Sequence, residues 1–406
     1  MNMIDLDVLR DCYTTTPSKI IMLVVDGLGG LPHPDTGLSE LETARIPNLN
    51  ALARESACGL STPVMPGVTP GSGPGHLALF GYDPLKYLIG RGALEALGID
   101  VALQPDDVAA RGNFCTVDGD GALVDRRARR IPSELSAPLC QRLDCIELEG
   151  VQVDVFPVQD YRFVLRLRGE GLSEAVTGTD PQRVGVPALP VEALDAKAEK
   201  TAALINGFVD QARQMLAEEE RANMVLLRGV AQLPNLPPMG RVYGLNPAGI
   251  AAYPMYRGLA TVAGMEVIPT GRIFADEVET LRQNLHAHDF FFLHYKPCDA
   301  AGEDGDFDAK VKRLEELDPF IPQIRELGAD ALVVAGDHST PAIMASHSWH
   351  PVPFLVHSRL TKGEGGTGFG GFNERACAQG SIGRIMATQI MLLALSHAGK
   401  LAKFGP

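Results

Sequence analysis

The sequence predicts an α/β protein with a doubly wound, mostly parallel β-sheet and an inserted α+β domain. Three apolar runs carry this prediction: IIMLVV (20–25), FFFLHY (290–295) and ALVVAG (331–336). Each run has the length of a buried strand, and segments with helical spacing lie between them. Such alternation is typical of doubly wound sheets, in which ligands bind at the carboxyl ends of the parallel strands.

The predicted helices support the same class. IPNLNALARES (46–56) has helical spacing behind an Ile-Pro entry, and a further helix is expected around 91–97. Near the other end of the chain, AKVKRLEELDPFIPQIRELG (309–328) and IGRIMATQIMLLALSHAG (382–399) each predict one helix. The chain therefore begins and ends with the α/β pattern.

The middle of the chain shows a different pattern of predicted secondary structure. NFCTVDGDGALVDRR (113–127) and VDVFPVQDYRFVLRLRG (153–169) predict antiparallel hairpin strands, with Asp-Gly pairs as turn signals. A long helix is predicted over 196–220 and a strand over 223–229, and NLPPMG (235–240) breaks the pattern. We therefore predict two domains, as expected for a chain of 406 residues. They are a core formed by 1–109 and 236–406, and an inserted domain formed by 110–235.

Composition narrows the class of function. The formal net charge of −14 argues against nucleic acid and anionic membranes as main partners, since both require a cationic surface. The N-terminus has no basic flank and no apolar segment of a secretory signal, and no run approaches the roughly 20 apolar residues of a membrane helix. The seven cysteines are scattered without CxxC spacing, which is typical of reduced thiols. These features predict a cytoplasmic globular protein.

Metal-binding residue types follow the three apolar runs. Asp26 follows the first run, Asp299 follows the second, and Asp337 and His338 follow the third, with His347 shortly after. Carboxylates and imidazoles at strand ends are ligands for divalent metals such as zinc or manganese. A hydrogen-bonded turn with a capping aspartate explains Asp337 and His338 about equally well. The glycines after Asp26 also suit a dinucleotide loop, although neither GxGxxG nor Walker spacing follows.

Ser72 is a candidate nucleophile. It stands in TPGSGPGH (69–76), where glycines and prolines leave its hydroxyl sterically open. The GxSxG elbow of α/β-hydrolases is missing, and a neighbouring metal would activate the serine without a histidine base. A simple loop serine is an equally good explanation of this segment alone.

Two charged segments complete the candidates. HYKPCDAAGEDGDFDAK (294–310) is dense in possible ligands, although its spacing does not fit an EF-hand and an acidic surface loop would look similar. DRRARR (125–130) concentrates guanidinium groups that suit phosphate or carboxylate, or forms a solvated turn. The candidate anion-binding residues here are Arg126, Arg127 and Arg130, with Arg91 and Arg228, each flanked by glycine, as weaker candidates.

Taken in order, these motifs resemble cofactor-independent phosphoglycerate mutase of the archaeal type, in the alkaline phosphatase superfamily. The resemblance covers nearly the whole chain. It includes the motifs VVDGLGG, TPGS, HLALFGYDP, IGRGALEALG, RGNFCTVD, DRRARRI, YRFVLRLRG, LLRG, HYKPCD, DGD, GDHSTP, SHSWHPVP and SIGRI.

The resemblance implies interconversion of 3- and 2-phosphoglycerate through a phosphoserine at Ser72, at two divalent metal ions and without 2,3-bisphosphoglycerate. Manganese is the expected metal, with magnesium, cobalt or zinc as alternatives. The implied ligands of one metal are Asp26, Ser72, Asp337 and His338, and those of the other are Asp299, Glu303 and His347. Lys296, in HYKPCD, joins the arginines as an implied substrate-binding residue, and the inserted domain is the implied lid over a small phosphorylated carboxylate.

The sequence departs from the family pattern at three positions. Glu303 stands where the family has histidine in Gly-His-Asp-Gly-Asp, and its carboxylate weakens the preference for zinc. Gly73 and Asn373 stand where acidic residues are usual. The alternatives are therefore a metal-dependent phosphatase or phosphotransferase on another small phosphorylated substrate, or a catalytically impaired relative with a binding role. The oligomeric state is not predicted.

Overall fold

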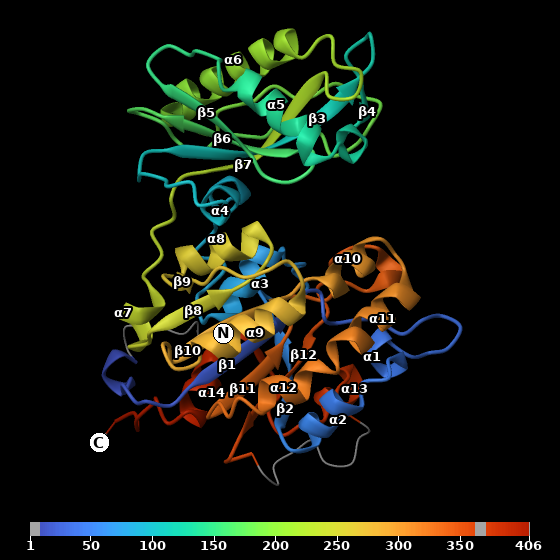
Figure 1. Cartoon of the computed structure of the whole chain (residues 1–406), viewed down its shortest axis with the longest axis vertical. Coiled ribbons are helices and arrows are strands. Elements are labelled where there is room, and N and C mark those ends of the chain that lie inside the picture. Colours follow the sequence, from blue (N-terminus) through green and yellow to red (C-terminus); the bar gives the residue numbers. More distant parts are fainter. Residues whose placement is uncertain (1–8, 362–370, 406) are drawn as a thin grey trace. The chain divides into compact units, whose positions relative to one another are not determined.

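The computed structural model describes residues 9–361 and 371–405, and it divides the chain into two compact units (Figure 1). We call Met1–Leu88 with Leu236–Pro406 the core unit, and Ile89–Asn235 the inserted unit. The second boundary agrees with the predicted 235/236, whereas the first lies at 88/89 instead of 109/110. The difference arises because the helix at 91–98 packs on the strands of the inserted unit. Among the described residues, no helix combines the length and apolar character needed to cross a membrane.

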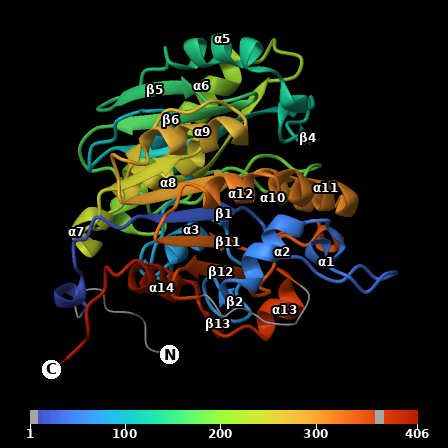
Figure 2. The ribbon, with the colours of Figure 1, turned by 60° about the horizontal axis from the view of Figure 1, so that its bottom comes forward.

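The core unit is built on an eight-stranded sheet with the order β13-β2-β12-β11-β1-β10-β8-β9. Its strands are β1 (Ile20–Val25), β2 (Ala57–Thr62), β8 (Pro247–Ile250), β9 (Glu266–Val267), β10 (Phe290–Tyr295), β11 (Ala331–Ala335), β12 (Val352–Ser358) and β13 (Gly383–Met386). Only β12 runs antiparallel to its neighbours, so the predicted α/β class with a mostly parallel sheet is confirmed. Figure 2 shows β1, β11, β12, β2 and β13 in succession.

Helices cover both faces of this sheet. The helices of the core unit are α1 (Glu40–Thr43), α2 (Pro47–Arg54), α3 (Ser72–Leu79), α7 (Met239–Tyr243), α8 (Pro254–Val262), α9 (Phe274–Asn284), α10 (Pro297–Glu303), α11 (Phe307–Leu317), α12 (Phe320–Arg325), α13 (Glu374–Ala378) and α14 (Ile390–His397). Residues of α1, α2, α9, α11, α12 and α13 share one apolar cluster with the strands. Ala248 and Ile250 of β8 belong to that cluster, whereas Gly249 between them faces Ala260 of α8 on the other side. Because successive residues of a strand point to opposite faces of the sheet, helices pack on both of its faces. The sheet is therefore doubly wound.

The central strands agree with their predicted positions because they are buried on both faces. Every residue of β1, β10 and β11 is buried. Continuous apolar runs are typical of such strands in parallel sheets. The helices predicted at 46–56 and 91–97 are also confirmed, as α2 and as α4 (Arg91–Gly98).

Two predicted helices are wrong in detail. The single helix expected at 309–328 is divided into α11 and α12, because Pro319 cannot continue the hydrogen-bond ladder of α11. Asp318 at the break accepts hydrogen bonds from the backbone of Asn48 (3.1 Å) and Leu49 (2.8 Å), which caps α2. The helix expected at 382–399 begins only at Ile390, since 383–386 forms β13 against β2.

The inserted unit is an antiparallel sheet between helices. It contains β3 (Val108–Val117), β4 (Leu123–Asp125), β5 (Gln152–Pro157), β6 (Arg162–Arg168), β7 (Met224–Ala231), α4, α5 (Ser133–Leu143) and α6 (Glu199–Met215). Residues of α5 and α6 share an apolar cluster with one face of the sheet, and Ala96 of α4 packs with Ala109 and Val164 on the other. The predicted hairpins and the helix at 196–220 are confirmed, although α6 itself ends at Met215.

Candidate metal centre and arginine cluster

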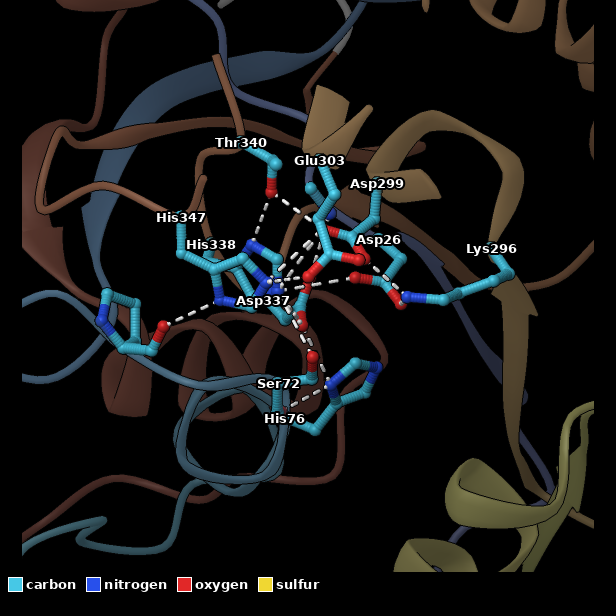
Figure 3. A network of polar contacts seen from close by, with 12 residues as sticks. Asp26, Ser72, His76, Lys296, Asp299, Glu303, Asp337, His338, Thr340 and His347 are labelled. Carbon is cyan, nitrogen blue, oxygen red and sulfur yellow. Dashed lines mark hydrogen bonds and ion pairs between the residues drawn. The ribbon is translucent and has the colours of Figure 1, made fainter. Parts of the chain in front are cut away.

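The strand register of the core unit brings the predicted ligands to one edge of the sheet. Val25 at the end of β1 pairs with Tyr295 at the end of β10, and Val24 pairs with Ala335 at the end of β11. The three parallel strands therefore end together. The residues that follow them include Asp26, Lys296 and Asp337, which meet at this edge (Figure 3).

The first candidate metal group consists of Asp26, Asp337 and His338, all of which are fully buried. The Nε2 atom of His338 lies 3.3 Å from Oδ1 of Asp26 and 3.2 Å from Oδ2 of Asp337. Ser72, the first residue of α3, places its Oγ atom 3.3 Å from the same nitrogen. The structure therefore brings together all four residues predicted for this metal.

The second candidate group consists of Asp299, His338 and His347. Nε2 of His347 lies 3.4 Å from Oδ1 of Asp299 and 3.6 Å from Oε1 of Glu303. The rings of His338 and His347 stack with their centroids 3.7 Å apart (Figure 3). Glu303, at the end of α10, is thus next to the second group, but its side chain is 56% exposed.

Hydrogen bonds orient both imidazoles. The hydroxyl of Thr340 donates to Oδ1 of Asp299 (2.7 Å), so it accepts its bond to Nδ1 of His338 (2.9 Å). Nδ1 of His347 donates to the carbonyl of Pro70 (2.9 Å). With Nδ1 as the donor in each ring, both Nε2 atoms face the carboxylates, which is the tautomer and orientation that metal-binding histidines require.

Unsatisfied buried oxygens indicate that these groups fit a divalent metal. Oδ1 of Asp26 and Oδ2 of Asp337 are buried and make no hydrogen bond to any described residue. Burying such atoms without a hydrogen bond is costly, and carboxylate oxygens beside imidazole nitrogens are a usual ligand set for divalent metals. The core unit therefore contains residue groups able to hold divalent metal ions.

Positive groups surround the other carboxylate oxygens. Nζ of Lys296 lies 3.0 Å from Oδ2 of Asp26 and also contacts Asp299 (Figure 3). Tyr256 donates its hydroxyl to Asp26. Although burial opposes ionisation, Lys296 and nearby histidines hold the pKa of Asp26 well below its ordinary value. Burial likewise opposes the charge on His347, but the Asp299 carboxylate raises the pKa of His347 to about 9. A metal would displace that proton.

The structure adds His76 and Tyr256 to the site, and it brings His294, one of the possible ligands predicted in the 294–310 segment, next to Asp26. His76, fully buried one helical turn after Ser72, lies with Nδ1 2.8 Å from the Ser72 carbonyl and 3.1 Å from Oδ2 of Asp337. His294, in β10, stacks on Tyr256 and lies with Nε2 3.3 Å from Oδ2 of Asp26. The spacing of four residues from Ser72 is a helical signal that could have identified His76. No comparable signal marked Tyr256.

The predicted arginines all belong to the inserted unit. Arg126 donates two hydrogen bonds to Asp180, at 2.9 and 2.7 Å, and one to the carbonyl of Gln182. Arg127 and Arg130 are exposed, and the backbone of the 128–130 segment has positive φ. Hydrogen bonds therefore fix the side chain of Arg126, whereas the side chains of Arg127 and Arg130 are exposed to solvent.

Arg228 and Arg91 belong to an arginine cluster that also includes Arg111 and Arg162. Arg111 of β3 pairs with Arg228 of β7 across the sheet, and the positive charges of Arg91, Arg162 and Arg228 all act on Arg111. Burial and the neighbouring arginines lower the pKa of Arg111 to about 10, against the attraction of Glu95. Glu95 lies 3.5 Å from Nε of Arg111, and Asp180 lies 3.8 Å from Nη1 of Arg228. Positive charge exceeds negative charge here, as in an anion-binding site.

Comparisons with known proteins identify the family. Residues 53–222 match the family model of 2,3-bisphosphoglycerate-independent phosphoglycerate mutase. A Thermus thermophilus protein named "Probable 2,3-bisphosphoglycerate-independent phosphoglycerate mutase" is 48% identical over 403 residues, which is 98% of each chain. A Thermotoga maritima protein of the same name is 48% identical over 395 residues, which is 97% of each chain.

Solved structures agree with this match. A Pyrococcus horikoshii protein superposes with a TM-score of 0.81 at 27% identity, over 96% of this chain and 99% of that chain. The cofactor-independent phosphoglycerate mutase of Thermoplasma acidophilum gives 0.67 at 27% identity, over 94% and 100%. With these relatives and the predicted ligands gathered at one sheet edge, the chain belongs to the 2,3-bisphosphoglycerate-independent phosphoglycerate mutase family.

Proposed function

We propose that this protein interconverts 3-phosphoglycerate and 2-phosphoglycerate, a step of glycolysis and gluconeogenesis, in the cytoplasm. The observation that carries the proposal is the position of Ser72. Its Oγ atom lies 3.3 Å from Nε2 of His338, the nitrogen shared by both candidate metal groups. A nucleophile in that position can act on a phosphate held by two metal ions.

We infer two divalent metals, with Mn²⁺ as the expected ion and Mg²⁺, Co²⁺ or Zn²⁺ as alternatives. Asp26, Ser72, Asp337 and His338 would hold one ion, and Asp299, Glu303 and His347 the other. When bound, these ions would favour the ionised form of Ser72 and neutralise charge on the oxygens of the transferring phosphate. No 2,3-bisphosphoglycerate is required, because Ser72 itself would carry the phosphate between the two positions.

The phosphate would move from C3 to C2 in two displacement steps, in each of which one bond to phosphorus forms as another breaks. Oγ of Ser72 would form a bond to the phosphorus of 3-phosphoglycerate as the bond from phosphorus to the C3 oxygen breaks. The serine gives up its proton and the C3 oxygen gains one, which leaves glycerate and phosphoserine. The C2 hydroxyl of glycerate then loses its proton and attacks the phosphoserine, so that the phosphate moves to C2 and Ser72 regains its hydroxyl. Lys296, beside Asp26, is a candidate to bind the substrate during both steps.

The inserted unit would bind the anionic groups of the substrate and retain glycerate. Arg91, Arg127, Arg130 and Arg228 are candidates, since guanidinium groups bind carboxylate and phosphate in a bidentate manner. Arg126 already donates to Asp180 and Gln182, which favours a supporting role for it. Exclusion of water by this unit is needed, because water would otherwise hydrolyse the phosphoserine.

A coupled assay tests the proposal. Purified protein with Mn²⁺ is given 3-phosphoglycerate, enolase converts the 2-phosphoglycerate formed, and inorganic phosphate is measured in parallel. We expect formation of phosphoenolpyruvate that stops when the metal is chelated and returns when Mn²⁺ is added back. Release of phosphate without 2-phosphoglycerate would instead identify a phosphatase, and the absence of both reactions with metal bound would identify a relative without this activity.

A further inference from the structure

We propose that Lys310 and Glu40 are positioning residues, which fix the loops carrying the metal ligands from inside the core unit and thereby set metal affinity. This inference rests on the metal-dependent function proposed above. Lys310 belongs to α11 and Glu40 begins α1, and both side chains are completely buried. Their charged groups lie 3.8 Å apart. Neither residue is among the candidate ligands.

The ammonium group of Lys310 joins the loop after β1 to the loop after β11. It donates to the carbonyl of Gly29 (2.9 Å) and to the carbonyl of Thr340 (2.8 Å). Gly29 lies three residues after Asp26, and Thr340 lies two residues after His338. The same two loops also meet directly, since the backbone N–H of Thr340 donates to the Gly29 carbonyl (3.0 Å).

The carboxylate of Glu40 joins the same loops from the other side. It accepts from the backbone N–H of Leu31 (3.2 Å), which follows Gly29, and from that of Ala342 (2.8 Å), which follows Thr340. The fit is close, because a Cβ atom built on Gly30 would lie 1.8 Å from Oε2 of Glu40. Lys310 thus donates to the carbonyls of both loops, while Glu40 accepts from their N–H groups.

Thr340 transmits this arrangement to the metal ligands. Its hydroxyl is bound to both His338 and Asp299, one ligand from each candidate group (Figure 3). Its backbone also packs directly on α10, since a Cβ atom built on Gly302 would lie 2.3 Å from the Thr340 carbonyl. A shift of Thr340 would therefore change the position of His338, of Asp299 and of the helix that ends at Glu303. Partners of this kind, which act through the ligands, typically change metal affinity about 10–100-fold when removed.

A second buried lysine offers a matched control. Lys400 is also buried, donates to the carbonyl of Thr16 (2.7 Å) and pairs with Asp289 at 3.0 Å. Asp289 precedes β10, so this pair lies at the amino ends of the strands, at the edge opposite the candidate metal centre. Burying a charge is costly unless it is paired, and removal of one partner destabilises the fold in both places. Only the Lys310 pair is connected to candidate metal ligands.

The test compares Lys310→Met with Lys400→Met in the full chain. Mn²⁺ binding is measured by titration well below the unfolding temperature, and Tm is measured without metal. We expect both variants to lower Tm, but only Lys310→Met to raise the Kd for Mn²⁺, by about 10–100-fold. Equal Kd values for Lys310→Met and the wild type would overturn the inference and leave the proposed metal site intact. A wild-type protein that binds no Mn²⁺ would overturn both.

A milder variant covers the case in which Lys310→Met does not fold. Glu40→Gln keeps the size of the side chain and replaces one acceptor oxygen by an amide group, which faces a backbone N–H. The same titration then decides the question. A Kd raised by about tenfold or more relative to Lys400→Met supports the positioning role, and an unchanged Kd overturns it.

Discussion

The candidate metal centre of the core unit and the arginine cluster of the inserted unit gather charged side chains of opposite sign, and they do so through different sheet geometry. In the core unit, carboxylates and imidazoles gather where parallel strands end together, and hydrogen bonds orient Asp299, His338 and His347. In the inserted unit, guanidinium groups lie side by side because antiparallel register pairs Arg111 with Arg228. Glu95 lies 3.5 Å from Arg111 of this cluster, and Asp180 lies 3.8 Å from Arg228.

This difference indicates what each unit is prepared to bind. The candidate metal groups of the core unit gather negative charge, with buried carboxylate oxygens that accept no hydrogen bond from the described residues, as suits a cation site. The arginine cluster of the inserted unit gathers positive charge, and burial together with repulsion between its guanidinium groups lowers the pKa of Arg111 and Arg228. Divalent metals would neutralise the charge of the first, and anionic groups such as phosphate or carboxylate would neutralise the charge of the second.

The largest expected effect separates chemistry from metal binding within the core unit. Ser72→Ala removes the nucleophile, so phosphotransfer should fall by at least about a thousandfold. The three remaining residues of the first group, Asp26, Asp337 and His338, should still bind Mn²⁺. The coupled assay measures the first outcome and a metal titration the second. Turnover close to the wild-type value in Ser72→Ala would exclude a phosphoserine mechanism.

The next effect concerns the inserted unit. Arg228→Ala should raise KM for 3-phosphoglycerate about 10–100-fold, as expected for loss of a charge-assisted contact, and leave Mn²⁺ affinity unchanged. Arg168→Ala is the control, because Arg168 has similar exposure (29% against 32%) but lies 2.6 Å from Asp107, whereas Arg228 lies 3.8 Å from Asp180. It should cost stability without raising KM. If the two variants changed KM equally, the cluster would have no special role in binding.

The comparison also separates what the sequence could predict from what it could not. β1, β10 and β11 were predictable because each is continuously apolar and buried, and their ends were marked by Asp26, Asp299 and the Asp337–His338 pair. Parallel strands then bring these residues together without further information.

Contacts between distant parts of the chain could not be predicted. Tyr256 reaches Asp26 across 230 positions, and Lys310 reaches Gly29 across 281, through tertiary packing that leaves no local pattern. The division of the 309–328 helix was missed for a related reason, since Asp318 is held there by α2. Even so, Pro319 was a local signal for that break.

A smaller effect is expected at position 303, where this chain has glutamate in place of the histidine of the family pattern. Glu303→Gln removes a carboxylate next to His347 and should weaken the second Mn²⁺ site about tenfold, with a smaller change for Zn²⁺. Asp304→Asn makes the same change of charge at the next, exposed residue and should have little effect. Competition titrations with the two metals measure both. Identical Kd values in the two variants would show that Glu303 does not reach the metal.

The smallest effect contrasts two buried glutamates, Glu277 of the core unit and Glu95 of the inserted unit. Burial raises the pKa of Glu277 to about 8, and the carboxylate of Asp276 adds to this, although backbone hydrogen bonds oppose it. The folded protein therefore keeps a proton that the unfolded chain loses near the ordinary pKa of 4.5. Stability then falls as pH rises between 4.5 and about 8, by up to about 1.4 kcal/mol per pH unit. Glu277→Gln should remove this slope, as measured by urea unfolding at pH 5 to 8.

Glu95→Gln should behave in the opposite way, because Glu95 faces the Arg111 guanidinium and its loss adds to the unbalanced positive charge of the arginine cluster. We expect Glu277→Gln to be more stable than the wild type at pH 8, and Glu95→Gln to be less stable by roughly 1–3 kcal/mol across the range. Destabilisation by both substitutions at pH 8 would mean that Glu277 is ionised and paired in the folded protein. The contrast between a protonated carboxyl group in the core unit and a charge-balancing carboxylate in the inserted unit would then be lost.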